Sequence, residues 1–179
     1  GDYPDSATAP AAANLPVKQK IDLSDKMSLE LTLIPAGEFV MGDAAGEVDE
    51  TPVSRVKIDK PFYMGMVEIR NDQYAAFDTN HDSGVISMTG KDQGDRGTRV
   101  NQPYQPVVRV TWNEAMAFCK WLSQKTGRKF TLPTEAQWEW ACRAGTESPF
   151  FYGNRDTDFS KFANLADASL KQLDRGDAP

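Results

Sequence analysis

Three side chains of this 179-residue chain belong to the types that most often carry redox, nucleophilic or metal chemistry: Cys119, Cys142 and His81. The two cysteines are too far apart in sequence for the paired ligands of a zinc site. His81 is the single histidine and lies in a loop rich in Asp, Asn and Gly, so we predict a surface position for it. A Ser-His-Asp triad would have to use this histidine, and no motif surrounds it. The sequence therefore names no catalytic residue.

A helix is predicted to position Cys119. Thr111 and Glu114 have the spacing of a capping box, in which each side chain binds the backbone N–H of the other residue. Cys119 then shares an apolar stripe with its helical neighbours Ala115, Phe118 and Leu122. Gly127 is a typical helix end. This pattern predicts a structural role for Cys119 as a small buried apolar residue rather than as a nucleophile.

A second helix is predicted to position Cys142. Thr134 and Gln137 form another capping box, within the run LPTEAQWEWACRAG. Trp138 and Cys142 are four residues apart and so share one helix face, which needs a partner surface. We predict a buried structural thiol here too. A disulfide to another segment, or a bond between the two cysteines, remains an alternative.

The aromatic and acidic residues of these segments are predicted to be structural. The tryptophans are expected to pack in the core, with one of the four facing solvent or a cleft, rather than to form a stacking platform: Trp112, Trp121, Trp138 and Trp140. Four glutamates occupy helix starts or surface positions, and no acid/base pair is assigned to them: Glu68, Glu114, Glu135 and Glu139.

The rest of the chain predicts an irregular, loop-rich α+β domain. Leucines alternate with polar residues over 29–33, which is typical of a half-buried strand, and shorter strands are predicted at 39–41, 53–58 and 62–67. A helix is expected to begin near Arg70–Asn71 and to carry Tyr74 and Phe77 on one face. The stretch 78–105 is a long loop, either functional or decorated with small strands.

Composition excludes several classes of protein. The net charge of −6 and the absence of a Lys/Arg cluster argue against a nucleic-acid partner. No apolar run is long enough for a transmembrane segment. Residues 1–25 include an Ala/Pro-rich stretch and are predicted to be a flexible tail. The chain begins at Gly1 rather than Met, which fits either a processed mature end or an artificial boundary.

Several motifs in order resemble the formylglycine-generating enzyme family, also called the sulfatase-modifying factor family. They run from IPAGEFVMG at 34–42 through EIRNDQYAAF at 68–77 and PVVRVTWNEAMAFCKWL at 106–122 to LPTEAQWEWACRAG at 132–145, FFYG at 150–153 and FANLAD at 162–167. Each motif alone is short, but the ordered set is specific. The resemblance implies that 26–179 is the N-terminal portion of a sulfatase-modifying-factor domain, whose C-type-lectin-like fold is present only in part in this chain.

The resemblance also implies an activity. Members of the family oxidise a cysteine of a sulfatase to formylglycine, with oxygen and with copper held by two cysteines. Those redox cysteines lie in a second half of the domain, beyond the matching motifs, whereas Cys119 and Cys142 match structural positions. Copper is therefore expected only if a completing segment carries the redox pair. At Arg70 the family usually has a Thr helix cap, so this helix start departs from the pattern.

A structural calcium ion is implied at Asn164 and Leu165, where an amide oxygen and a backbone carbonyl match a calcium-binding position of the family. Asp167, Asp174 and Asp177 are nearby acids that could contribute ligands. Calcium needs six to eight oxygen ligands, so these residues do not complete a site. A loop-capping role for Asn164 is the alternative.

Two further expectations follow from the partial domain. A second polypeptide is expected to complete the domain, with a break in an exposed loop near Asp174–Pro179, because half a fold would expose the faces of Trp138 and Phe118. A sulfatase or other protein is the expected substrate, and the location is expected to be secreted or periplasmic. One alternative is a non-catalytic lectin-like binding or structural module. Another is a related iron-dependent oxygenase, but such enzymes use histidine ligands, and this chain offers only His81.

Overall fold

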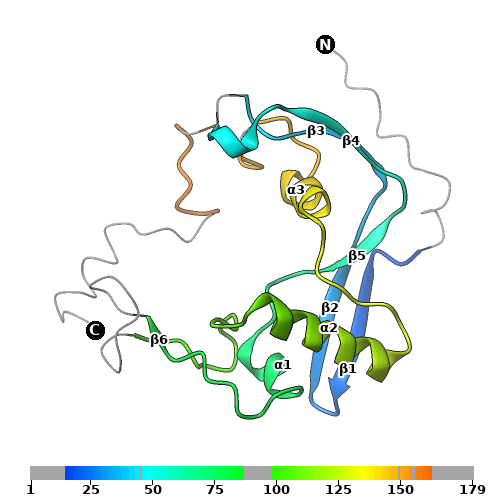
Figure 1. The fold of residues 1–179 in the computed structure, drawn as a ribbon, viewed down its shortest axis with the longest axis vertical. Coiled ribbons are helices and arrows are strands. Elements are labelled where there is room, and N and C mark those ends of the chain that lie inside the picture. The colour runs from blue at the N-terminus through cyan, green and yellow to red at the C-terminus, as the bar shows by residue number, and fades with distance from the viewer. Residues whose placement is uncertain (1–14, 45, 87–97, 149, 155, 163–179) are drawn as a thin grey trace.

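The computed structural model describes residues 15–44, 46–86, 98–148, 150–154 and 156–162, and it confirms an α+β, loop-rich architecture (Figure 1). Within these residues, no helix is long and apolar enough to cross a membrane. Two antiparallel β-structures and three α-helices carry the fold, and a short two-stranded ladder decorates the long loop. The described chain forms two packed regions, one around a three-stranded sheet and one around a hairpin.

The three-stranded sheet has the order β1-β2-β5, with β2 (Met27–Ile34) at the centre. Leu29 and Leu31 of β2 alternate with exposed Glu30 and face the core, as the sequence predicts. β5 (Phe62–Gly65) pairs with the second half of β2. β1 (Lys18–Ser24) corrects the predicted tail: its Ile21 lies opposite Leu29 and is buried. The sequence did not predict β1 because its apolar alternation consists of only Ile21 and Leu23, with Lys and Asp among the residues between and before them.

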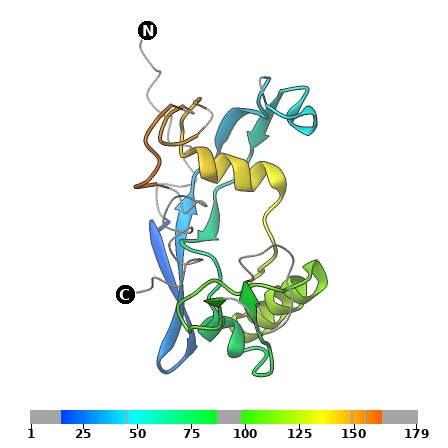
Figure 2. The same cartoon turned by 90° about the vertical axis from the view of Figure 1, so that its left-hand side faces the viewer.

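Two helices cover one face of this sheet. α1 (Asn71–Ala75) and α2 (Trp112–Thr126) lie beside β1 and β2 in both views (Figures 1 and 2). Their buried residues complete one core: Ile21, Leu23, Leu29, Leu31, Tyr74, Phe118 and Leu122. Phe118 is only 4% exposed, so this chain covers it by itself, contrary to the expectation that half a domain would leave it bare.

The second region consists of the β3–β4 hairpin and α3. β3 (Gly37–Met41) pairs with β4 (Ser54–Ile58), and the 3-10 turn η2 (Val48–Glu50) lies in the connection between them. α3 (Glu135–Arg143) packs on β3, where the Trp140 ring lies 5.4 Å from that of Phe39. Figure 2 shows α3 beside this hairpin, away from α1 and α2.

Both predicted capping boxes are present. Glu114 N–H donates to the Thr111 hydroxyl at 3.3 Å, and Thr111 N–H donates to the Glu114 carboxylate at 2.7 Å. Thr134 and Gln137 exchange equivalent bonds at 3.2 and 3.0 Å. Gly127 ends α2 in the left-handed conformation, with φ of 68°. These local signals fix where the two cysteine-bearing helices begin and where α2 ends.

Candidate functional site

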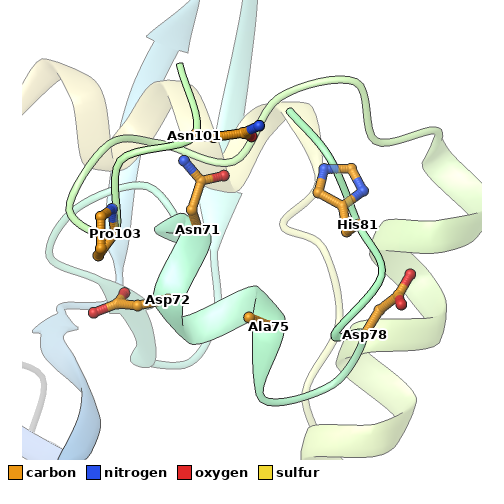
Figure 3. Close-up of a pocket in the computed structure, with 7 residues that line it drawn as sticks. All are labelled: Asn71, Asp72, Ala75, Asp78, His81, Asn101 and Pro103. Carbon is orange, nitrogen blue, oxygen red and sulfur yellow. The ribbon is translucent and has the colours of Figure 1, made fainter. Parts of the chain in front are cut away.

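A cleft lies between α1 and the two ends of the long loop (Figure 3). It has a volume of about 340 Å³ and is lined by Asn71, Asp72, Ala75, Asp78, His81, Asn101 and Pro103. The segment 71–78 supplies one wall, and the loop residues supply the others. β6 (Val85–Ile86) and β7 (Thr98–Arg99) pair just beyond the cleft and join the two sides of the loop. The predicted long loop is therefore decorated with small strands, and it contributes to a cleft.

Asn71 connects α1 to both ends of this loop. Its amide donates to the carbonyl oxygens of Val100 at 2.7 Å and Gln102 at 3.0 Å. Its side-chain oxygen accepts from the hydroxyl of Ser83 at 2.7 Å, and Ser83 is fully buried. The backbone N–H of Asn71 also donates to the Gln105 carbonyl at 2.9 Å, which satisfies a free donor of the helix start. The cleft walls are thus fixed by a side chain whose hydrogen bonds are directed into the protein.

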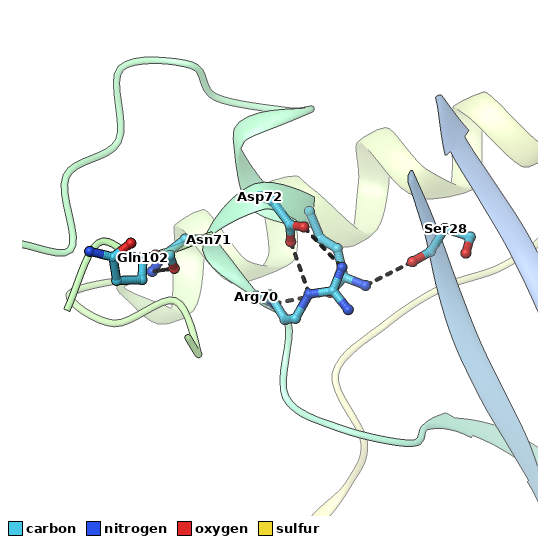
Figure 4. Close-up of polar contacts among 6 residues, drawn as sticks. Ser28, Arg70, Asn71, Asp72 and Gln102 are labelled. Atoms are coloured by element: carbon cyan, nitrogen blue, oxygen red, sulfur yellow. Dashed lines mark hydrogen bonds and ion pairs between the residues drawn. The ribbon is translucent and has the colours of Figure 1, made fainter. Parts of the chain in front are cut away.

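The start of α1 has Arg70 at the cap position, and Figure 4 shows the contacts that hold it. The Arg70 guanidinium donates two hydrogen bonds to Asp72, at 3.0 and 2.9 Å. The hydrogen bond to Asp72 is the main reason that the pKa of Arg70 is raised above its ordinary value. Gln73 accepts from Arg70 N–H at 3.0 Å and donates to the Ser28 carbonyl of β2 at 2.9 Å. A salt bridge and a buried amide therefore hold the helix start without a hydroxyl cap.

His81 is half-buried, which corrects the predicted surface position. Its Nε2 atom lies 2.9 Å from the Val108 carbonyl oxygen, and its ring packs edge-on against Tyr74 with 4.9 Å between centroids. Because a carbonyl oxygen only accepts, this contact requires the proton on Nε2. The imidazole therefore joins the loop to the segment before α2.

The cleft offers side chains that can form hydrogen bonds. Its ionisable groups are two aspartates and one histidine, and no thiol lines it. In the part of the chain that the structure describes, no group of three or more His, Cys, Asp or Glu residues is placed to hold a metal ion. A copper centre of two thiolates would need a different donor set.

Comparison with known proteins decides the family. The profile described as "Sulfatase-modifying factor enzyme 1-like domain" matches residues 18–178. This chain belongs to the sulfatase-modifying factor family. The formylglycine-generating enzyme of Streptomyces coelicolor is 31% identical over 180 residues, which cover 78% of this chain and 54% of that enzyme. The Bos taurus enzyme is 29% identical over 163 residues, which cover 68% of this chain and 42% of that enzyme.

A solved structure supports the same fold. The structure of PvdO from Pseudomonas aeruginosa superimposes with a TM-score of 0.59 at 26% identity, covering 87% of this chain and 60% of that one. This sulfatase-modifying factor family member spans about half the length of the curated relatives it matches. The family match begins at residue 18, at the start of β1, which agrees with the correction of the predicted tail.

The two predicted structural cysteines of this family member are both free thiols and are not bonded to each other. Cys119 is half-buried on α2, and burial raises the pKa of its thiol. A raised pKa keeps the sulfur protonated, which is the opposite of what a reactive thiolate needs. Cys142 is exposed, which corrects its predicted burial, because α3 faces β3 with the opposite side.

The predicted calcium residues Asn164 and Leu165 lie outside the described residues, as do Asp167, Asp174 and Asp177. The structure therefore leaves that site as a prediction. The sequence did not reveal the cleft or the partners of Glu139, which was placed among helix-start or surface carboxylates. Glu139 accepts from the Gly42 N–H at 3.0 Å and forms an ion pair with Arg143 at 2.6 Å. The i, i+4 spacing of Glu139 and Arg143 is the signal that could have revealed this pair.

Proposed function

We propose that this chain is the scaffold part of an oxidase that converts a cysteine of a sulfatase into formylglycine. The observation that carries the proposal is the family match over 18–178, together with relatives named as formylglycine-generating enzymes at 29–31% identity. In this proposal a completing polypeptide, equivalent to the second part of those relatives, supplies the redox cysteines. The sulfatase substrate and the completing polypeptide are both part of the proposal.

The thiols of the described chain do not fit a copper centre. Cys119 is on α2 in the sheet region, and burial disfavours its thiolate. Cys142 is on α3 in the hairpin region and is exposed. Copper(I) prefers thiolate ligands, and an oxidase must shield its reactive sulfur from competing reactions. We therefore assign copper, oxygen and the redox chemistry to the completing polypeptide and derive no step from the present cysteines.

The role of the present residues is to position elements. Hydrogen bonds hold the long loop against α1 and against the segment before α2, and they are made by Asn71, Ser83 and His81. Glu139 and Arg143 fasten α3 to the turn after β3 through both backbone groups of Gly42. Such side chains preorganise a framework against which a catalytic segment can be placed accurately.

The experiment that tests this proposal needs the coding sequence of the completing polypeptide. The completing polypeptide is defined as the sequence encoded after Pro179, or next to this gene, that aligns with the second part of the Streptomyces coelicolor relative. The joined protein is incubated with a peptide containing a sulfatase cysteine, a copper salt, oxygen and a thiol reductant, because reduction of oxygen to water takes four electrons and conversion of the peptide thiol to the aldehyde supplies only two. Mass spectrometry is expected to show replacement of the peptide thiol by an aldehyde that a hydrazine reagent traps.

The control is the double variant Cys119→Ala/Cys142→Ala. It is expected to keep aldehyde formation, since the redox cysteines come from the completing polypeptide. Loss of activity in a double variant with an unchanged melting temperature would instead make these cysteines part of the reaction. The absence of any such coding sequence, or a joined protein that leaves the peptide unchanged, would refute the proposal.

The remaining expectations are retained as proposals. A calcium ion braces the segment around Asn164 and Leu165, and equilibrium dialysis with calcium on the joined protein tests it. Export to the periplasm or the medium is proposed from the Ala/Pro-rich beginning and the family habit, and cell fractionation tests it. Neither bears on the oxidase assignment.

A further inference from the structure

β1 forms one edge of the three-stranded sheet. The strand order is β1-β2-β5, so among the described residues β1 has a neighbouring strand on one side only. Figures 1 and 2 show β1, in dark blue, as the outermost strand of this sheet. An edge strand presents a row of backbone N–H and C=O groups with which a strand of another chain can pair.

The backbone groups of β1 alternate between the two sides of the strand. In an antiparallel ladder, every second residue of a strand directs its N–H and C=O groups to the same neighbour. Leu33 N–H donates to the Val17 carbonyl at 2.8 Å, so the odd-numbered residues in the regular part of β1 face β2. Glu30 lies opposite Lys20 in the register, and its carbonyl accepts from Met66 N–H at 3.0 Å on the β5 side of β2. The backbone groups of Lys20, and of the residue two positions further on, therefore point away from the sheet.

The side chains of this edge are complementary in charge to a second copy of the same strand. Lys20 and Asp22 are both exposed, and the Lys20 Nζ atom lies 3.8 Å from Asp22 Oδ1. When two copies of β1 pair antiparallel about Ile21, Lys20 of one copy lies opposite Asp22 of the other, and these residues also have the outward backbone groups that form hydrogen-bonded pairs. A shift by two residues in either direction would place Lys20 opposite Lys20, or Asp22 opposite Asp22. Opposite charges across two strands attract and like charges repel, so the sequence favours a single register.

We propose that the outer edge of β1 pairs with β1 of a second copy of this chain, around a two-fold axis that passes beside Ile21. Such a contact is isologous, because each copy contributes the same segment. The charge complementarity of β1 with itself is the observation that favours this occupant. At the other edge of the sheet, β5 has four residues and none of them is charged, so that edge offers no comparable signal. The inference is independent of the proposed function, since it depends on β1 alone.

Sedimentation equilibrium of the chain over a range of concentrations tests the pairing. A thiol reductant is present, so that exposed Cys142 forms no disulfide dimers. We expect a monomer–dimer equilibrium that Asp22→Lys weakens roughly tenfold or more, because the two-fold axis converts two attractive pairs into two repulsive ones. Lys20→Asp/Asp22→Lys exchanges the two charges, so this double variant is expected to recover association to within about threefold of the unchanged chain.

Asp59→Lys is the matched control. Asp59 is exposed and lies 3.2 Å from Lys57 with the same spacing of two residues, but next to β4 in the other region. This variant is expected to leave association unchanged. All the replaced side chains are exposed, and the melting temperature of each variant shows whether its fold is kept.

Disulfide cross-linking tests the register. Chains with Lys20→Cys and chains with Asp22→Cys, each also carrying Cys142→Ser, are mixed and mildly oxidised. Residues in a hydrogen-bonded antiparallel pair have Cα atoms about 5.5 Å apart, which is within reach of a disulfide. The mixed disulfide is expected to predominate over the disulfide of either variant with itself, beyond its statistical share.

Several results would overturn the pairing of β1 with itself. A chain that stays monomeric at its highest soluble concentration refutes it, as do equal effects of Asp22→Lys and Asp59→Lys. Dimers that the charge exchange does not recover, or that cross-link each variant with itself, refute the proposed register. If the completing polypeptide dissociates the dimers and Asp22→Lys weakens its binding instead, the edge belongs to that occupant and not to a second copy. The proposed function has a separate test, since formation of the aldehyde is measured on the joined protein.

Discussion

Gln73 offers a sharp test of how α1 is attached to the sheet. Its side chain is 2% exposed, and it uses both ends of the amide: the oxygen accepts from Arg70 N–H and the nitrogen donates to the Ser28 carbonyl. In Gln73→Leu, both backbone groups lose their partner. Leaving a buried group unpaired costs about 1–3 kcal/mol, and the leucine side chain recovers part of this through apolar burial. We expect the free energy of unfolding to fall by about 2–4 kcal/mol.

Gln73→Glu isolates the donor end of the amide. The carboxylate can still accept from Arg70 N–H, but it would face the Ser28 carbonyl oxygen without a proton between them. Burial and this contact raise the pKa of the introduced carboxyl in the folded state. The folded protein then binds more protons than the unfolded one, so stability falls as pH rises from the unfolded pKa of about 4.3 to the folded pKa. Each unit of pKa elevation costs about 1.4 kcal/mol at neutral pH.

Urea denaturation followed by circular dichroism at pH 4 and pH 7 measures both variants. Relative to the unchanged chain, Gln73→Glu is expected to be close to neutral at pH 4 and destabilised by about 2–3 kcal/mol at pH 7, for a pKa raised by roughly two units. Gln73→Leu has no titrating group and serves as the control, with the same loss at both pH values. An equal loss for Gln73→Glu at the two pH values would refute the assigned donor and acceptor roles.

Three further predictions concern the helix caps and the packing of α3 on β3. Thr134→Ala is expected to lower the free energy of unfolding by about 1 kcal/mol in urea denaturation, through loss of the bond to the Gln137 N–H. The hydrogen bond from the Thr111 hydroxyl is the main reason that the pKa of Glu114 is lowered, so the stability linked to Glu114 is present above its unfolded pKa and lost as pH falls through the folded one. Thr111→Val is expected to raise the pKa of Glu114 toward its ordinary value in an NMR titration, and an unchanged pKa would contradict this cause. In Gly37→Ala, the new Cβ would lie 2.7 Å from the Trp140 ring, and an overpacked site costs about 1–3 kcal/mol; the second change Trp140→Leu is expected to reduce that cost.

The sequence predicted local structure best where short-range chemistry decides it. Both capping boxes depend on residues three apart, and both are present at the predicted positions. The alternation of Leu29 and Leu31 likewise has a local cause, because successive strand residues point to opposite faces. β1 was not predicted, because the burial of its apolar residues depends on pairing with β2. Its exposed face also carries Lys and Asp, which are uncommon in strands.

The candidate site was the harder part to predict, because contacts between distant residues decide it. His81 looks like a surface residue when its neighbours alone are considered, and only the bond to Val108 and the packing on Tyr74 show its position. Cys142 shares a face with Trp138, as predicted, but helix periodicity cannot say which face meets the β3–β4 hairpin. The ion pair of Glu139 and Arg143 with Gly42 decides that question, and it joins segments about 100 residues apart.

Burial is distributed unevenly between the two regions of the described chain. A chain that lacked half of one undivided core would leave residues such as Phe118 and Leu122 exposed, but these are 4% and 2% exposed. Among the described residues, the exposed aromatic residues lie mainly on α3 and in the segment 150–162, while the sheet region exposes Tyr104 in the long loop and Trp112 at the start of α2. The core of the sheet region is therefore closed within the described chain, and the exposed aromatic surface belongs mainly to the region of α3.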